Sequence, residues 1–182
     1  MIVDLWVGPV VPVARCAASL SAEDAAAVRR AATPAVADLV ATSRAMQRSV
    51  LARALGVGVE DVRIARRCAR CGRSGHGRPV AVDGPAYSMA RAGRVAAMAV
   101  VPDGVVGLDA EKDGVGSRAW VRGEAALKAR GLGIDRLWAP EPQRIFDGLH
   151  LVDLRAGPQI GALATDRPVT SVHWHRWRPG PP

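Results

Sequence analysis

The sequence of 182 residues has few aromatic side chains, little lysine and only three cysteines. It contains no apolar run of about 18 residues or more, so we expect no transmembrane helix. Residues 1–12 are apolar but include Asp4 and no basic segment, which argues against a secretion signal. Because three is an odd number, the cysteines do not suggest a disulfide framework, and we expect a protein of the reducing cytoplasm.

The chain is basic, with 25 Lys and Arg residues against 17 acidic ones and a net charge of +8. This balance favours anionic partners such as phosphate compounds, acidic proteins or nucleic acid. The arginines are scattered, and only residues 173–178 mix basic and aromatic side chains, so a nucleic-acid partner is disfavoured. Nearly half of the residues are apolar, which is enough for one ordinary domain or two small units packed together.

Residues 105–111 combine a buried apolar strand with two carboxylates. Val106 and Leu108 predict the strand, and Asp109 and Glu111 follow at a spacing that puts both side chains on one face. Such carboxylates repel each other unless a cation lies between them, and hard oxygen ligands suit Mg²⁺. The alternative is a solvated strand end without a ligand.

A helix predicted over residues 120–130 carries the next charges. Glu124 and Lys128 are four residues apart on one face, in the order that favours their pairing. The helix can therefore bring a third carboxylate and a cation to the strand end, as phosphoryl transfer requires. The alternative is a surface pair that only supports the helix.

The rest of the pattern is that of a mixed α/β chain. Ser21 is expected to cap a helix, and Gly56 to end the longest one. We expect a helix within residues 17–28 that begins after Ser21, and a second helix over residues 34–55. Strands are expected over residues 2–7, 62–65, 137–142, 149–154, 160–165 and 169–177, with a β-hairpin over 95–106 turning at 102–104.

The order Gly-x-Asp-x-Glu at 107–111, Trp-x-x-x-Glu-Ala-x-x-Lys at 120–128 and Gly-Leu-Gly at 131–133 resembles the 4′-phosphopantetheinyl transferase superfamily, in its larger, surfactin-synthetase-activating branch. The resemblance implies an α+β fold of two pseudo-repeated α/β halves with antiparallel sheets. These halves would be residues 1–102 and 103–182, with coenzyme A between them. The family moves 4′-phosphopantetheine from coenzyme A to a serine of an acyl or peptidyl carrier protein. A monomer is expected.

The resemblance also implies roles for individual residues. Mg²⁺ would be held by Asp109, Glu111 and Glu124, and Glu124 would take the proton of the acceptor serine. Lys128 would stabilise the diphosphate. The basic contacts to coenzyme A would come from the helix over 34–55, from 77–79 and from 87–92, namely Arg44, Arg48, Arg78 and Arg91.

Three features depart from the family pattern. Residues 90–92 are Ala-Arg-Ala where Ser-His-Ser or Ser-His-Thr is usual, Gly123 replaces a lysine, and residues 112–119 replace a longer segment. An alternative is therefore a catalytically altered relative that binds coenzyme A or an acyl thioester, or serves as an accessory protein in a biosynthetic pathway.

Cys68, Cys71 and His76 raise the further possibility of zinc. Structural zinc needs four ligands, and no fourth residue is adjacent, with Cys16 distant in the sequence. We favour a loop with unligated thiols over a zinc site.

Overall fold

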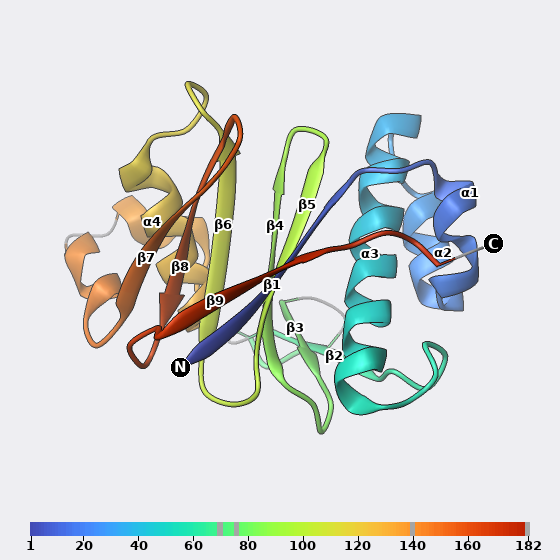
Figure 1. Ribbon diagram of the computed structural model, residues 1–182, viewed down its shortest axis with the longest axis horizontal. Helices are drawn as coiled ribbons and strands as arrows, with labels where there is room; N and C mark the ends of the chain where they lie inside the picture. The colour runs from blue at the N-terminus through green and yellow to red at the C-terminus, as the bar shows by residue number, and fades with distance from the viewer. Residues whose placement is uncertain (69–70, 75–76, 139–140, 181–182) are drawn as a thin grey trace.

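The computed structural model describes residues 1–68, 71–74, 77–138 and 141–180 as a mixed α/β fold of helices packed on mainly antiparallel sheets. Figure 1 shows the long helix α3 on one side of the strands and α4 on the other. The helices of this part are α1 (Val13–Cys16), α2 (Ala22–Arg29), α3 (Pro34–Leu55) and α4 (Arg118–Arg130), with the 3₁₀ helices η1 (Ala17–Ser19), η2 (Ile134–Trp138) and η3 (Pro142–Phe146). None of them is long and apolar enough to cross a membrane.

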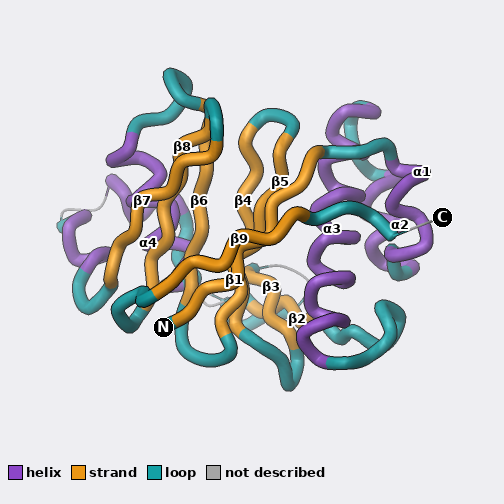
Figure 2. Tube along the Cα trace, in the orientation of Figure 1, coloured by secondary structure: helices purple, strands orange, loops and turns teal. Residues whose placement is uncertain are grey.

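The strands of the described residues form two larger sheets and a two-stranded one (Figure 2). The four-stranded sheet has the order β4 (Ala86–Ala92), β5 (Val95–Val101), β1 (Ile2–Pro9) and β9 (Ser171–Arg176). The three-stranded sheet has the order β6 (Val106–Lys112), β8 (Gln159–Thr165) and β7 (His150–Ala156). The remaining pair is β2 (Ile64–Arg67) with β3 (Arg78–Ala81).

The two larger sheets share one connectivity. In the first, β1 is followed by α3 and then by β4 and β5, and β5 lies between its two partners. In the second, β6 is followed by α4 and then by β7 and β8, and β8 lies in the middle. The last strand, β9, returns to pair with β1, so the end of the C-terminal half belongs to the sheet of the N-terminal half.

The packing follows the alternation of side chains along the strands. In β5, Ala96, Met98 and Val100 pack with α3, whereas Ala97, Ala99 and Val101 face the three-stranded sheet. The two sheets thus enclose a core between them, and each carries one helix on its outer face, α3 on the first and α4 on the second.

The ends of α2 and α3 carry residue types that cap helices. Ser21 and Asp24 form the capping box of α2, and Thr33 caps α3. Gly56 ends α3 with φ 69°, a left-handed conformation that suits glycine. The predicted bounds of α3 are confirmed, and α4 begins two residues earlier than predicted because Ser117 caps it.

Two predictions about strands are wrong. Residues 95–106 do not form a hairpin, because β5 pairs with β1 and β4 while β6 joins the other sheet. The strand predicted over 137–142 is replaced by 3₁₀ turns, with residues 139–140 outside the described part. The predicted antiparallel sheets are found, with one exception: β9 reaches β1 by a crossover and pairs with it in parallel.

The edges β4 and β6 of the two sheets meet without a ladder of backbone bonds. Instead, the Ser88 hydroxyl accepts a hydrogen bond from the Leu108 backbone nitrogen at 2.9 Å. One residue before Leu108, Gly107 allows β6 to approach α4 closely. A Cβ atom there would meet the Ala125 carbonyl oxygen and lie 2.5 Å from the Ala129 backbone nitrogen.

We predict that Gly107→Ala lowers the free energy of unfolding by about 3 kcal/mol, because α4 must move away from β6 to admit the methyl group. Denaturant unfolding measures this loss. Gly180→Ala is the matched control, since nothing lies within 4 Å of a Cβ there. Equal stability of the two variants would contradict the close approach of α4 to β6.

Candidate functional site

A cavity of about 370 Å³ lies between the two halves of the chain. One wall comes from α3, β2 and β4, and the other from β6 and α4. Six of the residues singled out from the sequence line this cavity: Arg44, Arg91, Asp109, Glu111, Glu124 and Lys128. The structure therefore brings together most of the predicted site, from four separate elements.

The acidic wall is built by β6 and α4. Asp109 and Glu111 alternate along β6, and Glu124 and Lys128 lie one turn apart on α4. The Lys128 ammonium lies 2.6 Å from Asp109 Oδ1 and 3.9 Å from Glu124 Oε2. It also donates to the Met89 carbonyl oxygen at 3.4 Å. Lys128 thus contacts β4, β6 and its own helix.

The carboxylates of this wall are electrostatically coupled. Burial raises the pKa of Asp109, and the Lys128 ammonium opposes that rise. Burial also raises the pKa of Glu124, with further increases from the negative charges of Asp109 and Glu111. A carboxylate whose pKa is raised by its neighbours is stabilised by any added positive charge. The wall consequently favours a further cation beyond Lys128.

Asp109 has one buried carboxylate oxygen whose charge is not met by a hydrogen bond. The residue is only 5% exposed, and its Oδ2 has no hydrogen-bond partner. Among the described residues, no three His, Cys, Asp or Glu side chains are already arranged as a metal cage. Mg²⁺ does not require one, because it usually takes one or two carboxylates together with substrate phosphates and water. The donor set therefore fits Mg²⁺ held jointly with a phosphate ligand.

The opposite wall is basic. Arg44 lies on α3, Arg66 on β2 and Arg91 on β4, and all three line the cavity. Arg44 is 3.6 Å from Asp24, and Arg91 is exposed. Within the described part of the chain, none of these arginines forms an ion pair with a carboxylate of the acidic wall. The cavity thus presents separate cationic and anionic sides.

Arg48, predicted to contact coenzyme A, lies outside this cavity. Its Nε donates to Asp24 Oδ2 at 2.5 Å, and its Nη1 donates to the carbonyl oxygens of Val59 and Val62. These bonds tie α3 to α2 and to the segment that follows α3. The guanidinium of Arg48 is therefore engaged in holding the fold together.

Arg78 is similarly engaged. It donates to the carbonyl oxygens of Ala129 at 2.9 Å, Val106 at 3.3 Å and Tyr87 at 3.4 Å, and so joins elements of both halves. Burial lowers the pKa of its guanidinium. Arg78 lines a second cavity of about 470 Å³, which shares Met89 and Lys128 with the first. It is thus adjacent to the candidate site, with its donors directed at backbone oxygens.

The zinc alternative is only partly described by the structure. Cys16 is buried in the core against α3, while Cys68 lines the second cavity. His76 lies outside the described residues, so the structure does not test whether Cys68, Cys71 and His76 bind zinc.

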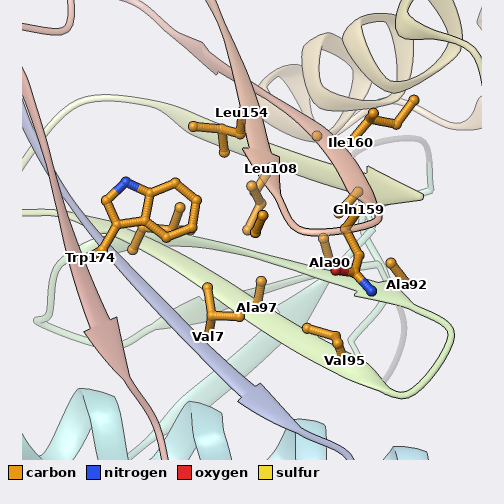
Figure 3. A pocket seen from close by; sticks show the side chains of 14 residues that line it. Val7, Ala90, Ala92, Val95, Ala97, Leu108, Leu154, Gln159, Ile160 and Trp174 are labelled. Carbon is orange, nitrogen blue, oxygen red and sulfur yellow. The ribbon is translucent and has the colours of Figure 1, made fainter. Parts of the chain in front are cut away.

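An apolar cavity lies on the other side of the contact between β4 and β6 (Figure 3). Val7 and Ala97 reach it from one sheet and Leu108 from the other, with Trp174 at one end. Its volume of about 40 Å³ is far below the roughly 150 Å³ of an engineered cavity that binds benzene. We therefore treat it as a packing space and not as a ligand site.

Comparison with known proteins assigns no family. No family model matches the sequence, and a search of curated proteins finds no match.

Sequence analysis missed Arg66 and Gln47, the two cavity residues besides Asp109 that carry a buried polar atom without a partner. Arg66 belongs to a short strand without a recognisable motif, so no signal marked it. Gln47 lies three residues after Arg44 in α3, and helical periodicity alone places both side chains on adjacent positions of one face. That spacing was the available signal.

We predict that Glu124→Gln raises the free energy of unfolding at pH 7, by less than about 1 kcal/mol because the carboxylate is partly exposed and screened by solvent. The raised pKa of Glu124 means that its charge destabilises the fold above that pKa. The destabilisation by this charge disappears as the pH falls below the ordinary pKa of glutamate. Near pH 3, Glu124→Gln should therefore leave the free energy of unfolding unchanged.

Denaturant unfolding at the two pH values measures the effect. Glu60→Gln, at an exposed position, is the control and should change stability by less than about 0.5 kcal/mol. A loss of stability in Glu124→Gln at pH 7 would show that Glu124 is not under electrostatic strain.

Proposed function

We propose that this chain is a Mg²⁺-dependent transferase that acts on a phosphate ester bound between its two halves. The observation that carries the proposal is the convergence of Asp109, Glu111, Glu124 and Lys128 on one cavity whose other wall is basic. Carboxylates that hold a metal, a lysine and opposing arginines are the groups that phosphoryl transfer uses to stabilise charge.

Together with the motif resemblance, this geometry favours one member of that class, a 4′-phosphopantetheinyl transferase. The donor would be coenzyme A, and the acceptor a serine of an acyl or peptidyl carrier protein. The proposal is supported by the order of the motif residues along β6 and α4 and by their position at the junction of two similarly connected sheets. The net charge of +8 also suits an anionic donor and an acidic partner.

Mg²⁺ would take its one or two protein ligands from Asp109, Glu111 and Glu124, and when bound it would supply neutralisation of the diphosphate charge. The protein side chains have separate tasks. Lys128, already poised at Asp109, donates to the diphosphate oxygens. Arg44 and Arg91 attract the remaining negative charge of the donor from the opposite wall.

In the transfer, the serine oxygen forms a bond to the phosphorus on the pantetheine side of the diphosphate. The bond from that phosphorus to the bridging oxygen breaks, and 3′,5′-bisphosphoadenosine leaves. The serine proton passes to the carboxylate of Glu124. A raised pKa makes this carboxylate a better proton acceptor than an exposed glutamate.

We predict that Glu124→Gln lowers the transfer rate by about 10²- to 10⁴-fold, the usual contribution of a general base. Loss of both Glu111 and Glu124 as glutamines should abolish transfer. The measurement is mass spectrometry of a panel of apo acyl and peptidyl carrier proteins incubated with the protein, coenzyme A and Mg²⁺.

Glu60→Gln, away from the cavity, is the control and should transfer at the wild-type rate. Undiminished transfer by the double variant would contradict the proposed roles. Binding of coenzyme A by the wild type without modification of any carrier would favour the alternative, a relative that binds the thiol compound without transferring from it.

A further inference from the structure

A cluster of metal-ligating side chains lies at the edge of the four-stranded sheet opposite the candidate site. The strand order places β4, which lines the candidate cavity, at one edge and β9 at the other (Figure 1). His173 and His175 alternate along β9, and Asp4 lies on β1, the neighbouring strand. Asp4 pairs with His173 in the parallel register, and residues two apart on a strand share a face, so all three side chains lie on one face of the sheet.

The ligand atoms of this cluster converge on one carboxylate oxygen. Asp4 Oδ1 lies 2.7 Å from His175 Nε2 and 3.8 Å from His173 Nδ1. With metal–ligand bonds of about 2.0–2.2 Å, two ligands of a four-coordinate ion lie roughly 3.3–3.6 Å apart. The two observed distances fall on either side of that separation. Small side-chain rotations would therefore let one ion contact all three atoms.

The imidazole of His175 is held in position by its neighbours. Its ring stacks on Trp6, with the ring centroids 4.4 Å apart and the planes inclined by 18°. The Arg53 guanidinium lies over the Trp6 ring, 5.6 Å from its centroid. A ligand whose ring orientation is fixed before binding loses less entropy when the metal arrives. His175 is therefore the preorganised ligand of the cluster.

The cluster is also open to solvent. The side chains of His173, Asp4 and His175 are 52%, 44% and 36% exposed, so a metal ion and its water ligands can reach them. No three such side chains of the described residues form a metal cage as they stand, because Asp4 and His175 are drawn together by their hydrogen bond. That hydrogen bond uses one imidazole and leaves the second, beside the same oxygen, without a role.

We propose that Asp4, His173 and His175 bind a divalent transition metal of the class that imidazole favours, such as Zn²⁺ or Ni²⁺. Water completes the coordination. Each bonding nitrogen needs a free lone pair, so a proton on His175 Nε2 shifts through solvent to the other ring nitrogen. The site joins the first strand of the chain to the last, and it does not depend on the proposed transferase activity.

Calorimetric titration of the untagged protein with Ni²⁺ tests the proposal. Ni²⁺ is the probe because thiolates select Zn²⁺ and the chain contains Cys68 and Cys71. Excess Mg²⁺ is present throughout to compete for the carboxylates of the acidic wall. We expect one Ni²⁺ per chain, with the affinity falling at least about tenfold in His173→Ala and in His175→Ala, since even an outer-shell partner is worth that much.

His150→Ala is the matched control, because it removes an exposed imidazole that begins β7, in the other sheet. It should bind Ni²⁺ as the wild type does. Asp4→Asn, which keeps an oxygen acceptor for His175 but removes the charge, should weaken binding about tenfold. No binding by the wild type, or equal affinities of the wild type and both β9 variants, would overturn the assignment.

Thermal unfolding supplies a second readout. A metal that binds only the folded chain stabilises it, so Ni²⁺ should raise the Tm of the wild type and of His150→Ala. The double variant His173→Ala/His175→Ala should unfold at the same Tm with and without Ni²⁺. An equal rise in Tm for the double variant and the wild type would place the metal elsewhere and contradict the proposal.

Discussion

The ion pair between Lys128 and Asp109 is the interaction on which the candidate site depends. Asp109 is buried, and a buried carboxylate is costly unless a cation and hydrogen bonds compensate it. Lys128 meets one of its oxygens at 2.6 Å, contacts Met89 on β4, and so links α4 to the edges of both sheets. The second oxygen of Asp109 is left without a partner. The same pair therefore links the two halves and leaves one buried oxygen of Asp109 without a partner.

The connectivity of the fold explains why such a cavity exists. Two sheets of the same strand order pack against each other, and their edges β4 and β6 meet without a regular ladder. Each sheet carries its helix on its outer face, so α3 and α4 flank the line where the edges meet. Basic residues from one half then face acidic residues from the other across that line. The separation of charge is a consequence of which half supplies each wall.

Sequence analysis could predict the elements with strong local signals. Helix α3 is fixed by Thr33, Pro34 and Gly56, and the pairing of Glu124 with Lys128 follows from helical spacing. It could not assign β5 and β6 to different sheets, because two adjacent apolar strands joined by a short turn usually form a hairpin. Nor could it show that the guanidinium groups of Arg78 and Arg48 are bonded to other parts of the chain, whereas Arg66 has a side-chain nitrogen without a partner. The partners of the first two are backbone oxygens and a distant carboxylate that only the folded chain brings near.

The proposed site requires a divalent metal bound between β6 and α4 and completed by a phosphate ligand. Paramagnetic broadening by Mn²⁺, a substitute for Mg²⁺, tests this claim directly in the presence of coenzyme A. We expect substoichiometric Mn²⁺ to broaden the backbone amide resonances of Asp109, Glu111 and Glu124 first, and to leave those of α1 and α2 sharp. Broadening centred on another part of the chain, or none at all with coenzyme A bound, would contradict the claim.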